Sequence, residues 1–467
     1  MTEVQFTNLK GGTVALSTET LTALRPQLRG TLCLKDEAGY HEARTIWNAM
    51  IDRRPSAVVR CHGASDVIQA VRLARDNGLL VAVRGGGHNI AGNAVCERGL
   101  LIDLSPMRSV RVDPKNRTAR VEPGVTLAEF DKEAQAFGLA TPLGINSTTG
   151  VAGLTLGGGF GWLSRKFGFT VDNLISADVV TADGALVQAS AAENGDLFWA
   201  IRGGGGNFGV VTSFGPDLTS GLIVHPFARA RELLAGYSKV AAAAPDDLTV
   251  WVVLRKAPPL PFLPAEVHGK EILVFAVCYA GDPGKAESAL APLRALGEPI
   301  ADVIGVQPYA AWQSAFDPLL TPGAFNYWKS HNFTALSDGL LDTVVEAVWT
   351  LPTGECEIFI AQLGGASSRV ATDASAYPHR DANFVMNVHT RWRDRSDEKA
   401  CIKWARELFA ATAPDATGGV YVNFMPEDET DRIAGAYGGN HVRLASLKAK
   451  YDPDNLFRLN QNVTPQA

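Results

Sequence analysis

The chain has 467 residues, of which 46% are hydrophobic and 20% charged, and its formal net charge is −6. That length suggests about three folding units with a buried core. The acidic balance without a basic stripe argues against a nucleic-acid partner. No segment approaches the roughly 18 uncharged apolar residues that a membrane span needs, and the first residues lack the pattern of a secretory signal. We therefore expect a cytoplasmic protein without a membrane partner.

Cysteine, histidine and glycine usage narrows the chemistry further. The six cysteines form no C-x-x-C pair and the histidines show no metal-ligand spacing, so we expect reduced thiols and no metal site. The 46 glycines exceed the roughly 33 that average composition predicts. They cluster at 85–87, 157–161 and 203–206. Glycine runs beside apolar segments mark places where the backbone passes close to another group.

The first 215 residues alternate between strand and helix patterns around these glycine loops. Apolar residues at helical spacing over 67–75 follow a capping segment at 64–66. An Asp183-Gly184 turn predicts a hairpin. The strands expected in this half cover 56–60, 79–83, 100–103, 110–112, 118–122, 177–181, 186–189 and 210–214. The expected helices cover 67–75, 127–137 and 193–202.

Beyond residue 218 the alternating segments become longer. Several strands with helices between them predict an antiparallel sheet with helices on one face. The tail is expected to form a helix over 438–450, which ends at Asp452-Pro453. The strands expected in this half cover 248–254, 271–278 and 356–362, and the helices cover 284–296 and 338–349.

The most informative motif is Arg84-Gly-Gly-Gly-His-Asn-Ile-Ala-Gly92, directly after a buried-type strand. Three consecutive glycines let successive backbone N–H groups converge on a phosphate. The loop also places His88 next to any group bound there. A surface turn with an incidental histidine is the alternative. No G-x-x-x-x-G-K-[ST] sequence occurs, which disfavours a nucleoside triphosphatase.

Two further glycine segments differ in what they indicate. Gly204-x-Gly206-x-x-Gly209 matches the dinucleotide fingerprint, but a helix pattern precedes it and a strand pattern follows, which is the reverse of the required context. We therefore reject a Rossmann site. The segment Gly150–Gly161 has small residues that allow a flat ring or a diphosphate to lie against the backbone. A tight packing crossover explains some of these glycines equally well.

Five motifs in fixed order carry a resemblance to a known family. They are Arg84–Gly92, Gly157-Gly-Gly-Phe-Gly-Trp-Leu-Ser-Arg-Lys-Phe-Gly168, Val171-Asp-Asn173, Thr181-Ala-Asp-Gly184 and Asp196–Val211, followed near the C-terminus by Tyr421-Val-Asn423 and Asn460-Gln-Asn462. This order resembles the vanillyl-alcohol oxidase superfamily with its PCMH-type FAD domain, and in particular the berberine-bridge-enzyme-like subgroup. The resemblance covers nearly the whole chain.

The resemblance implies an α+β fold. A PCMH-type two-part FAD-binding domain would be joined to a substrate domain that has an antiparallel sheet and flanking helices. The FAD-binding domain would cover 1–218, with its core at about 53–218. The substrate-binding domain would cover 219–411, and a C-terminal segment, 412–467, would return to the FAD-binding domain.

The resemblance also implies the cofactor and its contacts. His88 matches the histidine that is bonded to the flavin 8α-methyl group. The position that carries a second, cysteinyl link in many relatives is Asn146 here, so a single covalent bond to FAD is expected. Thr149 matches a side chain that gates oxygen access. The further cofactor-binding positions implied are Arg84, Gly85, Gly86, Gly87, Asn89, Gly92, Thr149, Gly150, Gly153, Gly157, Gly158, Gly159, Val210, Val211, Tyr421, Asn423, Asn460 and Asn462.

The catalytic side is read from strand parity. Period two puts Glu355 and Glu357 on the same face, and a carboxylate that faces a cavity suits a general base. Two glutamates on a solvent face are the alternative. Tyr421 and Asn423 also share a face, and the resemblance puts them beside the reactive side of the flavin. A core tyrosine is the alternative there. Tyr327-Trp-Lys329 is a further candidate for the pocket lining, and plain core is its alternative.

The function that follows is an FAD-dependent oxidoreductase that oxidises a small organic substrate by hydride transfer to flavin N5, with O2 as the acceptor. A dehydrogenase with another acceptor and a tailoring oxidase of natural-product biosynthesis are the enzymatic alternatives. A flavin-binding protein without activity is the remaining one. Fold alone does not choose the substrate among alcohols, sugars, amines and phenols.

Overall fold

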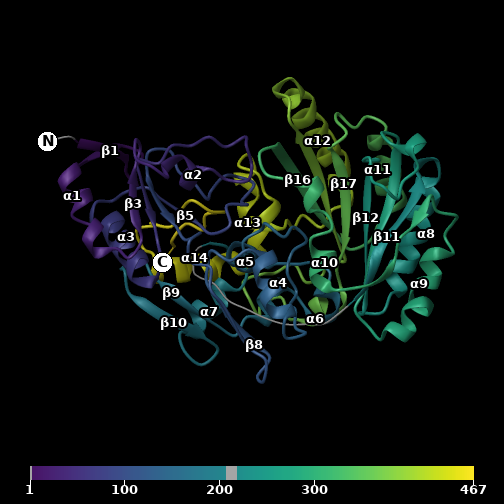
Figure 1. The fold of residues 1–467 in the computed structure, drawn as a ribbon, viewed down its shortest axis with the longest axis horizontal. Helices are drawn as coiled ribbons and strands as arrows, with labels where there is room; N and C mark the ends of the chain where they lie inside the picture. The colour runs from purple at the N-terminus through teal and green to yellow at the C-terminus, as the bar shows by residue number, and fades with distance from the viewer. Residues whose placement is uncertain (1–2, 207–217, 467) are drawn as a thin grey trace.

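The computed structural model describes residues 3–206 and 218–466, so the strand predicted at 210–214 lies outside the described residues. The fold is α+β, as predicted. Figure 1 shows two halves side by side: one carries both termini and the glycine loops, and the other is built around one large antiparallel sheet.

A four-stranded sheet places the first glycine loop. Its strands, in the order β3-β4-β6-β5, are β3 (Thr31–Leu34), β4 (Ala57–Arg60), β6 (Leu100–Asp103) and β5 (Val81–Arg84). Helix α3 (Ala64–Asp76) connects β4 to β5, and both strands run parallel to β6. The helix begins earlier than predicted, and Asp66 does not cap it. The Asp66 carboxylate instead accepts hydrogen bonds from the backbone N–H groups of Arg29 and His62, each at 2.8 Å.

The other short elements of this half surround the loops. They are β1 (Glu3–Thr7), β2 (Thr13–Ser17), α1 (Thr18–Thr22), α2 (Tyr40–Arg44), β7 (Val110–Asp113), β8 (Thr118–Val121), α4 (Leu127–Gln135), α5 (Val151–Leu156), α6 (Ser164–Phe167), β9 (Ser176–Val180), β10 (Leu186–Ser190) and α7 (Gly195–Ile201). The predicted hairpin is the β9–β10 pair. In the described residues, no helix is long and apolar enough to cross a membrane.

The large sheet has eight antiparallel strands. The path β14-β11-β13-β12-β17-β18-β16 holds seven of them, and β15 pairs with β11. The strands are β11 (Leu218–Pro226), β12 (Leu248–Lys256), β13 (Glu271–Tyr279), β14 (Ala301–Asp302), β15 (Gly305–Gln307), β16 (Phe325–Phe333), β17 (Glu357–Gln362) and β18 (Phe384–Trp392).

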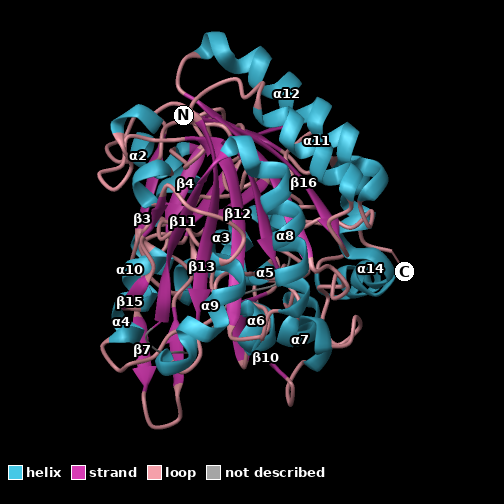
Figure 2. Ribbon diagram, turned by 90° about the vertical axis from the view of Figure 1, so that its right-hand side faces the viewer, coloured by secondary structure: helices cyan, strands magenta, loops and turns pink. Residues whose placement is uncertain are grey.

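Helices cover one face of this sheet, as predicted (Figures 1 and 2). They are α8 (Ala230–Ala243), α9 (Ala286–Arg294), α11 (Asp338–Val348) and α12 (Glu398–Thr412), while the short α10 (Tyr309–Gln313) lies near α4. Side chains alternate along each strand. On β12, Val250 and Val252 pack in the core beneath the helices, whereas Trp251 and Val253 face the opposite side. That opposite face forms a wall of the candidate site.

The C-terminal segment packs against the half that carries the glycine loops. It contains α13 (Ile433–Tyr437) and α14 (His441–Tyr451). Tyr437 and Leu444 share a core cluster with Trp199 of α7, and the Tyr437 hydroxyl donates to the Gln461 carbonyl at 2.9 Å. The division of the chain into 1–218, 219–411 and 412–467 stays a prediction.

Candidate functional site

A cavity of about 980 Å³ lies between the glycine loops and the large sheet. It is far larger than a packing void, since close-packed interiors leave few voids larger than a water molecule. The predicted site residues that line it are Gly85, Gly86, Gly87, His88, Asn89, Thr149, Gly150, Gly153, Glu357, Tyr421, Asn423 and Asn460. Segments far apart in the sequence therefore meet at one site.

His88 enters the cavity from the end of β5. Its imidazole stacks on Trp47, with ring centroids 4.9 Å apart and planes 25° apart. Nε2 lies 2.8 Å from Thr148 Oγ1, and the Thr148 hydroxyl donates to Asn146 Oδ1 at 2.7 Å. Thr148 Oγ1 therefore accepts the Nε2 proton, and Nδ1 keeps its lone pair.

The protonation of His88 follows from its surroundings. Burial lowers the pKa of the imidazole to about 3, although part of the ring is accessible from the cavity. The ring is therefore neutral at physiological pH. A neutral imidazole has an unprotonated nitrogen that is able to form a bond to carbon.

The two glycine loops touch through their backbones. A Cβ atom on Gly86 would lie 2.4 Å from the Gly150 backbone nitrogen, and a Cβ on Gly150 would lie 2.6 Å from that of Gly86. Side-chain carbons do not occupy such positions, so both residues must be glycine for the loops to meet. The result is a wall of backbone that is free of side chains beside His88.

A short segment ties the glycine loop to the large sheet. The backbone N–H of Trp47 donates to the Gly87 carbonyl at 3.1 Å, and the Asn48 side chain donates to the backbone carbonyl of Asn326 on β16 at 3.0 Å. The Asn326 N–H donates back to Asn48 Oδ1 at 3.1 Å. These bonds set the spacing between the wall that carries His88 and the wall formed by the sheet.

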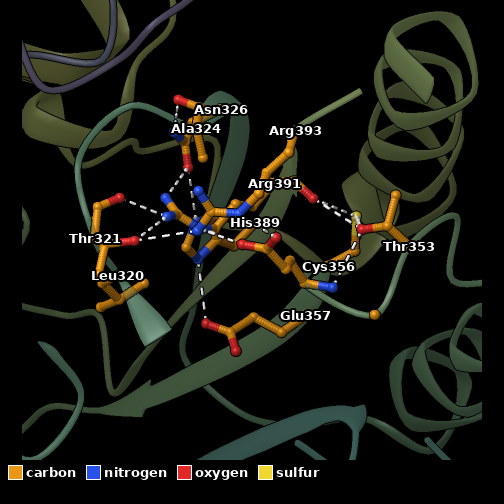
Figure 3. A network of polar contacts seen from close by, with 12 residues as sticks. Leu320, Thr321, Ala324, Asn326, Thr353, Cys356, Glu357, His389, Arg391 and Arg393 are labelled. Carbon is orange, nitrogen blue, oxygen red and sulfur yellow. Dashed lines mark hydrogen bonds and ion pairs between the residues drawn. The ribbon is translucent and has the colours of Figure 1, made fainter. Parts of the chain in front are cut away.

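Three charged or titratable side chains on neighbouring strands meet at the sheet wall. Glu357 on β17 is 8% exposed, and its Oε2 accepts from Arg255 Nη1 at 2.6 Å. Its Oε1 lies 3.2 Å from His389 Nδ1 (Figure 3). Burial alone would raise the pKa of Glu357, but the positive charge of Arg255 and the hydrogen bond from His389 bring it down to about 2. Glu357 is therefore a carboxylate at neutral pH.

His389 is held on both sides. Its Nε2 lies 3.4 Å from Asn326 Oδ1, which also accepts from Arg391 Nη1 at 3.3 Å. Both ring nitrogens of His389 thus face oxygen atoms. A carboxylate with a pKa near 2 is a weak base at neutral pH, and Glu357 is better suited to orient its neighbours than to take a proton.

Glu355, the other carboxylate on this predicted face, has a different place. It does not line the cavity, and its two oxygens accept from Arg391 Nε and Arg393 Nε, each at 2.8 Å. Glu355 precedes β17, where its side chain is free to turn toward these two arginines and solvent. The prediction that the strand alternation points both glutamates into the cavity is therefore right for Glu357 and wrong for Glu355.

Tyr421 and Asn423 close the cavity from the C-terminal segment. The Asn423 side chain donates to Tyr421 Oη at 2.8 Å and to the Leu154 carbonyl at 3.2 Å. Burial raises the pKa of the Tyr421 hydroxyl above its usual value, so this group is a neutral phenol. A Cβ atom on Gly157 would lie 2.2 Å from Asn423 Oδ1. The absence of a side chain at Gly157 therefore makes room for the Asn423 side chain.

Several predicted cofactor residues do not line the cavity, and most have a packing role that explains them. Arg84 donates to the Ala43 carbonyl at the end of α2. A Cβ atom on Gly92 would lie 2.8 Å from the Ile51 side chain. A Cβ on Gly158 would lie 2.7 Å from Tyr377, and a Cβ on Gly159 would lie 2.2 Å from Thr170. The predicted positions outside the lining are Arg84, Gly92, Gly157, Gly158, Gly159 and Asn462, while Val210 and Val211 lie outside the described residues.

Three other lining residues, Arg255, His389 and Trp47, were not singled out from the sequence. Of the Tyr327-Trp-Lys329 segment, which was expected at the pocket, Trp328 lines the cavity. The side chains of Tyr327 and Lys329 point away from it and contact Asp428 at 2.7 and 3.1 Å. One signal was present: His389 lies in a nine-residue strand, Phe384–Trp392, in which every residue is buried. A polar residue in such a strand needs a partner.

Comparisons with known proteins agree with this geometry. A model of the FAD binding domain matches residues 55–190, and a berberine and berberine-like model matches 420–464. The (R)-6-hydroxynicotine oxidase of Paenarthrobacter nicotinovorans is 31% identical over 461 residues, which cover 94% of this chain and 97% of that protein. The chain belongs to the FAD-linked oxidoreductases of the berberine bridge enzyme-like family.

Two further relatives support this assignment. An uncharacterised FAD-linked oxidoreductase of Bacillus subtilis is 30% identical over 457 residues, which cover 94% of this chain and 98% of that protein. The crystal structure of 6-hydroxy-D-nicotine oxidase from Arthrobacter nicotinovorans has a TM-score of 0.83 at 29% identity, and it covers 94% of this chain and 98% of that one. The predicted family and fold class are thereby confirmed.

The residues present fit FAD. The backbone wall at Gly86 and Gly150 leaves room that a Cβ atom would fill, and the three-glycine turn offers backbone N–H groups of the kind that bind a pyrophosphate. His88 faces the same space as a neutral imidazole. The protein is thus an FAD-linked oxidoreductase whose cavity has one wall of backbone and one wall of side chains.

Proposed function

We propose that this protein is an oxidase that carries FAD on a single covalent bond to His88 and oxidises a small organic substrate. When bound, FAD supplies the acceptor for a hydride at N5 and passes the electrons to O2. The observation that carries the proposal is the neutral imidazole of His88, which projects from the glycine loop into the cavity.

The residues around His88 support a bond at this position. Trp47 stacks on the ring and fixes its plane, while Thr148 accepts the Nε2 proton and leaves Nδ1 unprotonated, with the Thr149 hydroxyl 3.5 Å away. Asn146 occupies the place where many relatives have a second linking residue, and its side chain is engaged by Thr148. An asparagine does not form such a link, so we infer one covalent bond.

The residues on the other walls bind and orient the substrate. Tyr421, as a neutral phenol, is suited to donate a hydrogen bond into the cavity, and Asn423 holds its oxygen in place. Glu357 keeps Arg255 and His389 at the sheet wall. Thr149 lines the cavity beside His88, and we propose that its side chain controls the access of a small acceptor such as O2.

The decisive experiment unfolds the purified protein in acid and asks whether flavin stays on the polypeptide. We expect one FAD mass on the wild-type chain by intact mass spectrometry and none on His88→Ala. The control is His41→Ala, an exposed histidine on α2 that does not line the cavity and whose loss should leave the flavin attached. Release of flavin from the wild-type chain would overturn the covalent bond.

The acceptor is tested separately. A substrate that reduces the flavin without air should consume O2 in air, with hydrogen peroxide as the product. Turnover only with an artificial acceptor such as a quinone would show a dehydrogenase. Absence of flavin reduction by any alcohol, amine, phenol or sugar would favour a flavin-binding protein without activity.

A further inference from the structure

The sheet wall of the cavity is divided into a polar row and an apolar patch. Strand register aligns the polar row across four strands: Trp328 pairs with His389, His389 with Glu357, and Glu357 with Arg255. Arg255 and Glu357 neutralise one another, and His389 is already held by Glu357 and Asn326. This row offers a confined set of polar contacts at one edge.

Beside the polar row, the same wall has a patch whose side chains contain only carbon. Strands β11, β12 and β13 contribute this apolar patch, which we define as the cavity-lining residues Leu222, Val224, Val253, Ile272, Val274 and Ala276. Register places Val253 opposite Val274, and Val274 opposite Val224. The side chains of these residues carry no hydrogen-bonding group, so a hydroxyl placed against them loses its water without gaining a partner.

A proline-rich loop covers this patch. The roof loop, Pro258-Pro-Leu-Pro-Phe-Leu-Pro264, connects β12 to β13, and four of its residues line the cavity: Pro258, Leu260, Phe262 and Leu263. Leu263 packs in one cluster with Val224, Ile272 and Val274. Proline has no backbone N–H, so this loop has few donors to offer. This part of the cavity is therefore lined by apolar side chains on the sheet side and on the side of the roof loop.

An aromatic group lies between the apolar patch and Tyr421. Trp251 and Phe359 stack with planes 5° apart and centroids at 5.8 Å, and Phe424 packs edge-on against Phe359 at 5.8 Å. The Trp251 and Trp328 indole N–H groups are buried and have no acceptor among the described residues. Flat rings pack well against such aromatic faces.

We propose that the substrate is an apolar, ring-containing compound with its oxidisable hydroxyl or amine at one edge, and that it is not a sugar. This inference rests on the proposed function, because it names the substrate class of the same site. The reacting edge lies toward the polar row and Tyr421, and the apolar rings extend over the patch beneath the roof loop. A sugar carries hydroxyls around its whole ring and would leave several of them unpaired here.

The test measures binding without requiring any reaction. Equilibrium dialysis of the purified holoprotein compares 2-acetylnaphthalene, an apolar ring ketone that has no hydride to give, with cellobiose. We expect the naphthyl ketone to bind at least 100-fold more tightly. Equal or tighter binding of cellobiose would overturn the proposal.

Variants locate the ligand. Val253→Asp places a charge in the apolar patch and should weaken binding of the naphthyl ketone at least tenfold. Val306→Asp makes the same change on β15, where the side chain is 69% exposed, and should have no effect. If Val253→Asp does not fold, Val253→Thr makes the comparison, because it adds a hydroxyl at nearly constant size, and a several-fold loss is expected. Unchanged affinity in the folded Val253 variant would overturn the proposal.

Failure of this inference and failure of the proposed function are distinguishable. If the naphthyl ketone binds at the patch but neither 2-naphthylmethanol nor 2-naphthylmethylamine reduces the flavin, the ligand class stands and the redox function is contradicted. If cellobiose or glucose reduces the flavin while the ketone does not bind, the redox function stands and the ligand class is contradicted.

Discussion

Glu357 and His389 lie opposite one another on β17 and β18, and the Glu357 carboxylate contacts the imidazole at 3.2 Å while it holds the Arg255 guanidinium at 2.6 Å. One buried carboxylate therefore fixes two neighbours at the cavity wall. Its pKa of about 2 keeps it charged at every pH at which the enzyme would work. Glu357 acts as a permanent charge at this wall.

The first prediction concerns that charge. Glu357→Gln keeps the size of the side chain but removes the charge that orients His389 and Arg255, and we expect flavin reduction by substrate to slow about 100-fold. The control is Glu355→Gln, nearby in the chain but outside the cavity, which should change the rate less than about twofold. Rapid-mixing spectroscopy of the flavin without air measures both. Equal decreases in the rate of flavin reduction in the two variants would contradict the claim that the Glu357 charge orients the cavity wall.

The second prediction concerns Tyr421. Because the phenol is neutral, it serves as a hydrogen-bond donor, and its loss should not depend on pH. Tyr421→Phe is expected to slow flavin reduction by about 10-fold or more, by the same factor at pH 7 and pH 9. Asn423 keeps its bond to the Leu154 carbonyl, so the free energy of unfolding should fall by only about 1 kcal/mol. A factor that grows with pH would show that Tyr421 acts as a base.

The third prediction concerns a buried acid away from the cavity. Both oxygens of Asp131 in α4 are buried without a partner among the described residues, and burial raises the pKa of this carboxyl well above its ordinary value. An acid whose pKa rises on folding destabilises the folded state above its unfolded pKa of about 3.9, by up to about 1.4 kcal/mol per pH unit until the folded pKa is reached.

Asp131→Asn removes this titration at nearly constant shape. We expect its free energy of unfolding to exceed that of the wild type by more at pH 7 than at pH 5, as measured by urea unfolding. Glu133→Gln, on the exposed side of the same helix, is the matched control and should show no such difference. An advantage that shrinks as the pH rises would refute the neutral, buried acid.

The fourth prediction concerns the contact between the glycine loops. Gly86→Ala forces a Cβ atom against the Gly150 backbone at 2.4 Å, where no flexible side chain is able to move aside. We expect loss of bound flavin and a lower melting temperature. Gly339→Ala on α11 meets no atom within 4 Å, and it should keep its flavin and gain up to about 1 kcal/mol of stability. Normal flavin content in Gly86→Ala would show that the loops separate without cost.

The sequence determined the parts of this protein whose signals are local. Glycine runs, the apolar run before Arg84 and alternation over 248–278 depend only on neighbouring residues. They predicted β5, the loop that carries His88, and strands β12 and β13. The resemblance carried by the motifs added FAD and brought in Tyr421 and Asn423, which line the same cavity as His88.

Tertiary structure alone decided which residues share the sheet wall. Glu357 meets His389 across 32 positions of the chain and Arg255 across 102, through cross-strand register that no local pattern encodes. The glycines show the same limit: Gly86 approaches the backbone of Gly150, whereas Gly158 makes room for Tyr377. A missing side chain looks identical in both cases, because glycine records only that space is needed and the folded chain decides what fills it.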